Sequence, residues 1–395
     1  MSWRYLKIED FCSTGSGGTP SRSKPEYYEG GDIPWIKSGD LKDSKIYDAN
    51  EYITAAGLEN SSAKIVEKDS ILIAMYGATV GRLAILGINA ATNQAICNIR
   101  PDMTIADIKY LYYFLKSKFS YFVENAVGGA QPNISQGLIK SLEVPLPSLD
   151  EQKRIADILD KADAIRQKRE QAIKLADDFL CATFLDMFGD PVENPKKLKK
   201  APITELADVI TGFAFKSNEY ISDTPESVRL CRGANTLTGY LDWADTKFWP
   251  KNKLEKLDNY LIKAGDIILA MDCPWISSGL KVCIFPENQR ETYLVQRVAR
   301  LRPRCESYTN YIYSCIKSPA FEKHCCPTET TVPHISPVEL KNFEVLIPPD
   351  ELMVNFHSIV SIINNSLNKM ASGDIDSDAL FSKLSQQAFS GHLKR

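Results

Sequence analysis

Residues Asn133–Gln152 read NISQGLIKSLEVPLPSLDEQ, and a closely similar stretch, HISPVELKNFEVLIPPDEL, occupies His334–Leu352. The second stretch lies 201 positions after the first, and each leads into a segment with helical periodicity. Self-similarity over this distance indicates an internal duplication. Six residues are identical in the two copies: Ile134, Ser135, Lys140, Glu143, Val144 and Pro147 recur as Ile335, Ser336, Lys341, Glu344, Val345 and Pro348.

The duplication extends along nearly the whole chain. Further pairs of similar segments follow one another in the same order in both halves, at offsets that drift from 195 to 202. Loop insertions would produce such a drift, and the unchanged order is a stronger signal than any single match. The chain is therefore predicted to be built twice. The pairs are Glu9–Gly15 with Thr204–Gly212, Asp32–Leu41 with Ser227–Thr236, Lys68–Met75 with Ala264–Met271, and Thr92–Pro101 with Leu294–Pro303.

Each half begins with a region that is predicted to be rich in β-strands. Short aliphatic runs such as Ile71–Ala74 and Ile267–Ala270 are bounded by Gly, Asp and Pro turn signals. A helical patch follows in each half, with the aromatic stripes YLYYFL and YIYSCI, which we expect to pack against a sheet. We place the two β-rich domains at residues 1–148 and 201–349.

A long helix is predicted at residues 149–190. Ser148, with Glu151 three residues later, forms a capping-box pattern at its start. Apolar residues then recur at intervals of three and four, until Gly189 and Pro191 end the pattern. A small domain cannot bury so long an apolar stripe alone, so a second helix should cover it.

The second helix is expected at residues 350–395, with a break near 371–377, where Gly373 stands among residues favoured in turns. A basic linker at 191–200, which contains KKLKK, precedes the second domain. About 14 residues separate the end of the first helix from the second β-rich domain, and they reach at most ~50 Å, which favours an antiparallel helix pair that needs only a turn. The predicted fold is α+β: two similar β-rich domains joined by two long antiparallel helices, a coiled-coil-like spacer with a pseudo-two-fold internal repeat.

Composition is that of an ordinary globular protein, with 44% hydrophobic and 25% charged residues. No apolar run approaches the ~18 residues of a spanning helix, and the start, MSWRYLKIEDF, does not resemble a secretory signal, so no membrane partner is expected. The ten cysteines and four histidines are scattered, without a CxxC pair. This usage argues against a zinc site or a disulfide framework and predicts a cytoplasmic protein.

Two similar domains held at a fixed distance can read two separated sites. Duplex DNA returns its major groove every ~34 Å, which suits a pseudo-two-fold reader of a two-part target. Because the two domains differ in sequence, the two half-sites should differ too. The formal net charge of -3 is low for a nonspecific DNA-coating protein. Contacts with double-stranded DNA must therefore come from local patches, or be shared with partner subunits.

A family resemblance rests on several motifs in a fixed order. These are GGTPS, IPWIKSGDL, YGATVGR, NQAICNI, then GGAQPNISQGLIKSLEVPLPSLDEQKRIADILDKAD, and a second copy that ends LSQQAFSGHL. Together they resemble the specificity subunit of type I restriction-modification systems, over essentially the whole chain. The resemblance implies that each β-rich domain is a target recognition domain and that the helices are conserved spacer regions.

The resemblance also implies partners and cofactors. Two methyltransferase subunits would dock around the helices, and restriction subunits would join them. The complex would methylate adenine with S-adenosylmethionine, or translocate and cut unmodified DNA. S-adenosylmethionine, ATP and Mg²⁺ would belong to those partner subunits, and this chain would bind no cofactor or metal.

Motifs for catalysis are missing from the sequence. There is no Asn-Pro-Pro-aromatic or Asp-Pro-Pro-aromatic methylase motif, and no phosphate-binding P-loop. GSGGTP at Gly15–Pro20 lacks the strand-then-helix context of a cofactor loop, so we interpret it as a DNA-facing or structural turn. His334 lies near Ser336, but the first copy has Asn133 in place of the histidine. The sequence therefore predicts a non-catalytic subunit of an enzyme complex.

Other functions stay open. The chain could be the targeting subunit of a modification-only or other phage-defence system, in which no translocating nuclease is present. It could also be a protein-interaction scaffold that spaces two protein partners. A hydrolase that uses Ser and His is disfavoured by the missing triad.

Candidate DNA-binding residues are polar or basic side chains in predicted loops, because phosphates are bound by cations and hydroxyls and base edges by Arg, Lys, Asn, Gln, Ser or Thr. Asn93 and Gln296 could instead satisfy buried backbone groups. In the first domain the candidates are Thr19, Ser21, Arg22, Lys24, Lys37, Ser38, Tyr76, Thr79, Arg82, Gln131 and Asn133. In the second they are Lys216, Arg229, Arg232, Asn235, Trp275, Ser277, Ser278, Lys281, Arg297, Thr330, Thr331 and His334.

Overall fold

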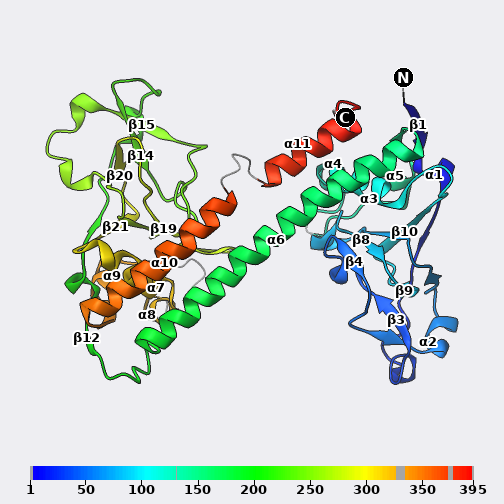
Figure 1. Cartoon of the computed structure of the whole chain (residues 1–395), viewed down its shortest axis with the longest axis horizontal. Helices are drawn as coiled ribbons and strands as arrows, with labels where there is room; N and C mark the ends of the chain where they lie inside the picture. Colours follow the sequence, from blue (N-terminus) through cyan, green and yellow to red (C-terminus); the bar gives the residue numbers. More distant parts are fainter. Residues whose placement is uncertain (1–2, 130, 326–333, 372–376, 394–395) are drawn as a thin grey trace. The chain divides into compact units, whose positions relative to one another are not determined.

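The structure is a computed structural model that describes residues 3–129, 131–325, 334–371 and 377–393 (Figure 1). The chain forms two compact units. Unit 1 contains Met1–Glu170 and Gly373–Arg395, and unit 2 contains Gln171–Ser372. Each unit takes part of the long helix α6 (Leu149–Phe188) into its own core, whereas we assigned residues 149–190 to a spacer from the sequence. The predicted domain boundaries therefore stay a prediction.

Unit 1 is built on two sheets and a strand pair. The first sheet has the order β2-β10-β7-β8-β4, the second has the order β5-β3-β9-β6, and β1 pairs with β11. The strands are β1 (Arg4–Lys7), β2 (Cys12–Ser16), β3 (Ile33–Ile36), β4 (Ser44–Ile46), β5 (Tyr52–Ile53), β6 (Ile65–Val66), β7 (Ile71–Ala74), β8 (Leu83–Leu86), β9 (Ala90–Thr92), β10 (Ile96–Pro101) and β11 (Glu143–Leu146). The helices are α1 (Ile8–Phe11), α2 (Ala55–Glu59), α3 (Ile108–Ser117), α4 (Phe119–Glu124), α5 (Gln136–Lys140) and α11 (Ser377–Phe389), with the first part of α6.

Unit 2 repeats this plan. Its sheets have the orders β13-β21-β16-β19 and β15-β14-β20, β12 pairs with β22, and β17 pairs with β18. The strands are β12 (Lys199–Pro202), β13 (Ala207–Thr211), β14 (Ser227–Cys231), β15 (Lys247–Pro250), β16 (Ile267–Ala270), β17 (Trp275–Ile276), β18 (Gly279–Leu280), β19 (Val282–Ile284), β20 (Thr292–Leu294), β21 (Val298–Pro303) and β22 (Glu344–Ile347). The helices are α7 (Thr309–Lys317), α8 (Pro319–Cys325), α9 (Pro337–Asn342) and α10 (Asp350–Ala371), with the last part of α6.

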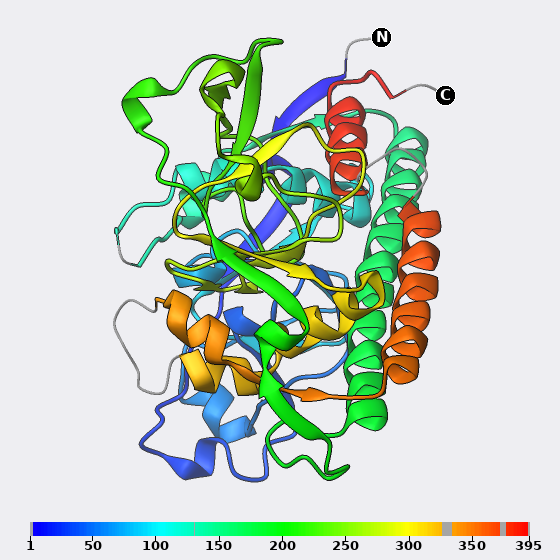
Figure 2. The same cartoon turned by 90° about the vertical axis from the view of Figure 1, so that its left-hand side faces the viewer.

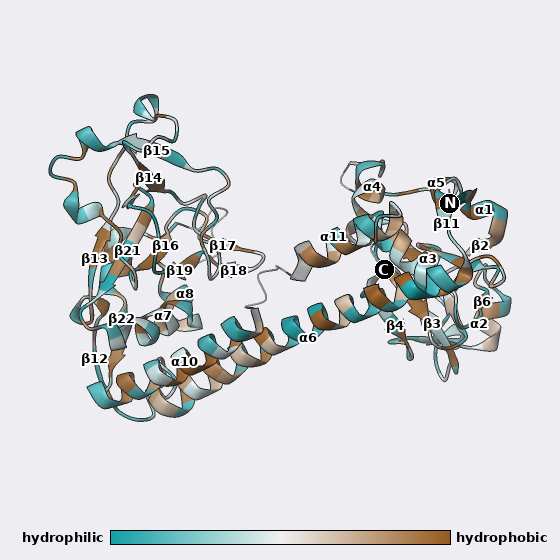
Figure 3. Ribbon diagram, turned by 45° about the horizontal axis from the view of Figure 1, so that its top comes forward, coloured by the Kyte–Doolittle hydropathy of each residue, from teal (hydrophilic) through white to brown (hydrophobic). Residues whose placement is uncertain are grey.

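The predicted α+β fold with an internal repeat is confirmed. The antiparallel order β2-β10-β7-β8 in unit 1 matches β13-β21-β16-β19 in unit 2. The parallel pair β3 and β9 matches β14 and β20. Helix α3 and helix α7 supply the predicted aromatic stripes, and both bury them against the sheet of their own unit. Hydropathy colouring of the ribbon shows brown, hydrophobic segments in strands of both units (Figure 3).

One tyrosine hydrogen bond recurs in both units. The buried Tyr110 hydroxyl donates to the carbonyl oxygen of Pro145 at 2.5 Å, and the Tyr311 hydroxyl donates to that of Leu346 at 2.6 Å. Each bond ties the aromatic helix to the strand that leads into α6 or α10. Because strand and helix are joined by only a few residues, the tyrosine also fixes where the long helix starts.

Helix α6 begins and ends with local caps. Ser148 Oγ accepts a hydrogen bond from the Glu151 amide at 3.4 Å, which is the predicted N-cap. Gly189 takes a positive φ of 80°, a conformation that favours glycine, and Lys196 Nζ donates to the carbonyl oxygen of Met187 at 2.9 Å. The first residue of the basic run KKLKK therefore satisfies a carbonyl of the last helical turn.

Within unit 2, the end of α6 lies beside α10, and the two run in opposite directions (Figures 1 and 2). The Phe188 ring lies 4.7 Å from the Tyr311 ring and 5.4 Å from the Phe356 ring, centroid to centroid. These residues are buried, so aromatic packing holds the antiparallel pair. Helix α10 ends at Ala371 and α11 begins at Ser377; the rest of the predicted break lies outside the described residues.

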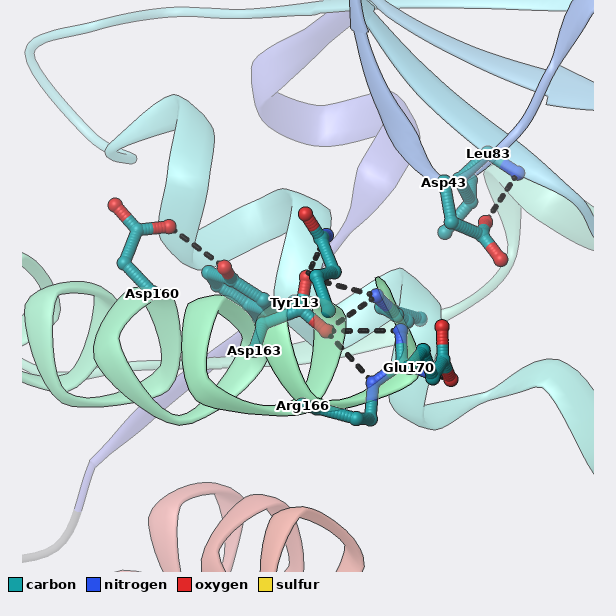
Figure 4. A network of polar contacts seen from close by, with 9 residues as sticks. Asp43, Leu83, Tyr113, Asp160, Asp163, Arg166 and Glu170 are labelled. Atoms are coloured by element: carbon teal, nitrogen blue, oxygen red, sulfur yellow. Dashed lines mark hydrogen bonds and ion pairs between the residues drawn. The ribbon is translucent and has the colours of Figure 1, made fainter. Parts of the chain in front are cut away.

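Within unit 1, the first part of α6 is fastened to α3 by a polar network (Figure 4). Asp163 is 5% exposed and accepts from Lys116 Nζ at 3.2 Å, from Arg166 Nε at 3.1 Å and from Gln167 Nε2 at 2.9 Å. The Tyr113 hydroxyl donates to Asp160 at 2.6 Å, one turn earlier. A buried carboxylate must be paired in this way to remain charged, so the network fixes the rotation of α6 about its axis.

We predict that Tyr110→Phe and Tyr311→Phe each destabilise only the unit that carries the change. Each variant leaves a buried carbonyl without its donor, which costs about 1–3 kcal/mol. Amide hydrogen exchange, followed separately for the two units, measures the effect. Tyr240→Phe is the matched control, because Tyr240 is 60% exposed and should change stability by less than about 0.5 kcal/mol. Equal loss of protection in both units would contradict the prediction.

Candidate nucleic-acid interface

The candidate interface of unit 1 is organised by a turn at residues 92–96, which we call turn 1. Its backbone is bonded on three sides: the Asn93 amide donates to Ile36 at 3.0 Å, the Met75 amide donates to Ala95 at 2.7 Å, and the Gly18 amide donates to Thr92 at 2.9 Å. Turn 1 therefore lies between the ends of β3 and β7. The loops with five of the eleven first-domain candidates begin at these strand ends.

Unit 2 builds the same turn at residues 294–298, which we call turn 2. The Val295 amide donates to Cys231 at 3.0 Å, the Met271 amide donates to Arg297 at 2.9 Å, and the Phe213 amide donates to Leu294 at 3.0 Å. These bonds correspond one by one to those of turn 1. They make Gln296 equivalent to Gln94 and Arg297 equivalent to Ala95. A further pair of bonds agrees, since the amides of Ile134 and Ile335 donate to Met75 and Met271, both at 2.9 Å.

The backbone of a glycine lies very close to the backbone of each turn. A Cβ atom on Gly17 would lie 1.9 Å from the Thr92 carbonyl oxygen, and one on Gly212 would lie 2.2 Å from that of Val295. No side chain fits at that separation, so only glycine lets the two backbones meet. This contact accounts for the GSGGTP motif as a structural turn beside the candidate interface.

In unit 1, two basic side chains converge on Glu51, in the loop before β5. Arg22 forms an ion pair with it at 2.6 Å, and Lys37 pairs with its other carboxylate oxygen. The Arg22 guanidinium also lies 4.4 Å from the Tyr28 ring centroid and 5.1 Å from that of Trp35. The hydrogen bond from Lys37, together with Arg22, holds the pKa of Glu51 below its ordinary value. One carboxylate thus positions two candidate cations beside an aromatic surface.

A second group in unit 1 surrounds the turn between β7 and β8. Tyr76 and Asn133 form an isolated β-bridge, and Thr79 Oγ1 donates to the Tyr76 carbonyl at 3.0 Å. Arg82 is exposed, and among the described residues its side chain forms no hydrogen bond or ion pair. Its guanidinium is therefore free to bind a phosphate or a base edge.

In unit 2, the basic candidates near β14 are partly used inside the protein. Arg232 pairs with Asp245 at 2.8 Å, and Asn235 is 1% exposed and donates to the Asp242 carbonyl at 3.0 Å. Arg229 lies 3.6 Å above the Trp243 ring, and burial lowers its pKa. Lys247 and then Arg232 lower the pKa of Asp245 to about 2. This part of unit 2 is a folded support more than an open contact surface.

A carboxylate without a counterpart in unit 1 lies beside turn 2. Asp272, two residues after the end of β16, accepts from His334 Nδ1 at 2.6 Å and from Arg297 at 3.2 Å, both on Oδ1. Lys281 Nζ donates to the Asp272 backbone carbonyl at 3.5 Å. Three predicted residues from three separate loops are thus brought together around one aspartate.

The remaining candidates lie on the surface of their units with few shared partners. Thr19 Oγ1 donates to Gln94, Ser21 bonds to Ser23, Lys24 to the Tyr27 hydroxyl, and Ser278 to Thr238. Thr330 and Thr331 lie outside the described residues. The others are exposed or half-buried: Ser38, Gln131, Lys216, Trp275 and Ser277. No contact with a nucleic acid tests any of these positions, so they stay predictions.

Sequence reasoning missed Gln94, Glu51 and Asp272. Gln94 could have been found from the sequence, because the alignment of TNQAICNIRP with LVQRVARLRP pairs it with Gln296. Both glutamines are exposed, whereas Asn93 is half-buried with its Oδ1 shielded from solvent and without a partner in the described residues. Glu51 and Asp272 gave no signal, because an acidic residue in a loop is usually a solvated one.

His334 and Ser336, which are close in sequence, bond to different partners in this arrangement. His334 bonds to Asp272, while Ser336 Oγ accepts from the Glu339 amide at 3.1 Å and caps α9. Among the described residues, no three His, Cys, Asp or Glu side chains gather closely enough to hold a metal ion. In the same residues, no helix is both long and apolar enough to cross a bilayer.

Comparisons with known proteins agree with this geometry. A family profile described as "Type I restriction modification DNA specificity domain" matches residues 2–175. Two relatives from Methanocaldococcus jannaschii are the type I restriction enzyme MjaVIII specificity subunit, 25% identical over 88% of this chain and 82% of its own, and the MjaIX specificity subunit, 26% identical over 97% and 92%. The crystal structure of a type I restriction-modification system S subunit from M. genitalium aligns over 98% of this chain and 96% of its own, with a TM-score of 0.58 and 15% identity, which supports the same fold.

We predict that Glu51 produces an acid-dependent change around Trp35. Because the pKa of Glu51 is lower in the folded state than in the unfolded chain, its stabilising effect is present above pH 4.5 and is lost as the pH falls through the lowered value. The indole N–H resonance of Trp35, whose ring lies 5.1 Å from the Arg22 guanidinium, should therefore shift below pH 4.5. In Glu51→Gln this shift should vanish.

Glu67→Gln is the control for this titration, because Glu67 pairs with Arg100 instead and is 66% exposed. That variant should keep the shift of the wild-type protein. A shift that persists in Glu51→Gln would show that another carboxylate controls the Trp35 environment.

Proposed function

The chain belongs to the family of type I restriction-modification DNA specificity subunits, and from this membership we propose that it recognises a bipartite, asymmetric DNA site and directs partner subunits to it. Unit 1 would read one half-site and unit 2 the other. Sequence-specific DNA recognition is the general function of the family. The two-part address and the recruitment of partners are the finer steps that the following observations support.

The observation that carries the proposal is a shared backbone with different side chains. Turn 1 and turn 2 share three main-chain hydrogen bonds, and a glycine approaches each turn closely, Gly17 at Thr92 and Gly212 at Val295. Beside the turns, Tyr76 bridges Asn133 in unit 1, and the equivalent bridge in unit 2 joins Asp272 and His334. Residues that approach base edges decide which bases are accepted. Equal frameworks with unequal side chains suit two half-sites of different sequence.

Local charge supports DNA contact despite the formal net charge of -3. Arg82 is exposed in unit 1, and Lys281 is half-buried and extends toward the Asp272 carbonyl in unit 2. Both follow equivalent strands, β7 and β16. We assign them to phosphate contacts, which position a duplex without reading its sequence. The rest of the attraction for DNA would come from partner subunits.

The proposed partners are two methyltransferase subunits and, where present, restriction subunits. Helix α6 leaves Leu175 and Phe179 exposed by 60% and 54%, which supports a protein partner on that helix. The partners would supply S-adenosylmethionine, ATP and Mg²⁺, with adenine as the methylated base. We propose a non-catalytic role for this chain, with no cofactor of its own.

Sequencing of modified bases in the genome tests the proposal directly. Cells that express this chain with its methyltransferase subunits should carry a gapped motif with two different halves, and deletion of this chain should abolish its methylation. A continuous or palindromic motif would contradict the asymmetric two-part address. Methylation that survives the deletion would reject the recognition function.

We predict that Arg82→Ala and Lys281→Ala weaken binding of the assembled complex to its cognate duplex. Each loses about one phosphate contact, so the slope of log affinity against log salt should fall by about 1. Titration of a labelled duplex at several salt concentrations measures both quantities.

Two matched controls each remove a lysine near the start of β7 or β16, the end opposite to the loops with Arg82 and Lys281. Lys45 pairs with Asp69, which precedes β7, and Lys263 precedes β16. Lys45→Ala and Lys263→Ala should leave affinity and salt slope unchanged. If all four variants behave alike, the β7–β8 and β16–β19 loops do not contact DNA.

A further inference from the structure

We propose that Arg297 reads a guanine in the half-site of unit 2 and that Asp272 is the residue that positions it. This inference rests on the proposed function and assigns one base of the recognised DNA site. Unit 1 has no such reader at the equivalent place. The address should therefore contain a G·C pair in one half that has no counterpart in the other.

The contacts around Asp272 fix the position of the Arg297 guanidinium. Asp272 Oδ1 accepts from Arg297 at 3.2 Å and from His334 Nδ1 at 2.6 Å. The histidine must carry its proton on Nδ1 for this bond, because an ionised carboxylate only accepts. His334 thereby fixes the carboxylate from one side, and the carboxylate fixes Arg297 from the other.

The backbone of Arg297 has a conformation that its side chain does not favour. Its φ is 69°, in the left-handed region that residues other than glycine rarely adopt. The bond from the Met271 amide to the Arg297 carbonyl holds it there at 2.9 Å. Ala95, at the equivalent place in turn 1, is not among the described non-glycine residues with positive φ. Such backbone strain is typical of functional sites.

The ion pair between Arg297 and Asp272 contributes little to the stability of the fold. The side chains of Arg297 and Asp272 are 62% and 48% exposed, and ion pairs at such exposed places contribute little to folding. Only one N–H group of Arg297 is bonded to Asp272, and its other donors face no partner among the described residues. These remaining donors form the planar fork that matches the O6 and N7 acceptors of guanine.

The neighbouring side chains of unit 1 offer different chemistry. Ala95 replaces the arginine, Tyr76 replaces the aspartate, and Asn133 replaces the histidine. None of these has a guanidinium, and the amide of Asn133 is neutral. The two units therefore differ in charge around turns that share the same main-chain hydrogen bonds.

The test is motif mapping with the full methyltransferase complex. Arg297→Ala should leave the half-site of unit 1 unchanged and make one G·C position in the other half degenerate, with discrimination there falling about 5- to 150-fold. Arg297→Lys should lose the same discrimination, since lysine retains charge without the fork. Asp272→Asn, which keeps an acceptor at Oδ1, should be milder at this position than Asp272→Ala. A merely structural role would not relax a single base position.

Other outcomes overturn the assignment in distinguishable ways. If Arg297→Ala methylates the same motif as the wild-type protein, Arg297 does not read a guanine, and the proposed function is unaffected. Uniform weakening of every position would make Arg297 a phosphate contact. A motif without any G·C pair specific to one half would also reject it. Absence of any motif that depends on the wild-type chain would reject the proposed function together with this inference.

Discussion

The close approach of two backbones at Gly17 and at Gly212 is the constraint on which each candidate interface depends. There the residue directly after β2 or β13 meets the turn that precedes β10 or β21, at a separation that excludes any side chain. Main-chain hydrogen bonds then fix the turn between the ends of two strands that belong to different sheets. Because main-chain atoms do this work, the surrounding side chains are free to differ between the units.

The parts of the fold that could be predicted from the sequence are those set by local rules. The duplication was visible because strands, turns and helix starts need the same apolar and glycine residues in both halves, as Ile71–Ala74 and Ile267–Ala270 show. The start of α6 followed from a capping pattern at Ser148. Such features depend on residues a few positions apart, so one sequence is enough to reveal them.

The polar pairs of the site could not be predicted in this way. Arg22 and Glu51 are separated by 29 positions, and Asp272 and His334 by 62. Nothing local marks either acid as a partner of a candidate cation. The basic run at Lys196–Lys200 was equally uninformative, because charge counting cannot show that Lys196 bonds to the carbonyls at the end of α6. Pairing across loops is a property of the folded chain.

This division of labour has a consequence for how recognition can change. A substitution at Gly17 would force two backbones apart and strain the whole turn, so the framework tolerates little variation. A substitution at Arg297 or Asp272 removes an exposed pair that contributes about 0–1 kcal/mol to folding. Side chains on the rim of each turn can therefore be exchanged at small cost in stability. A duplicated chain with this construction can alter the side chains of one unit while its other unit, and the fold of both, remain as they were.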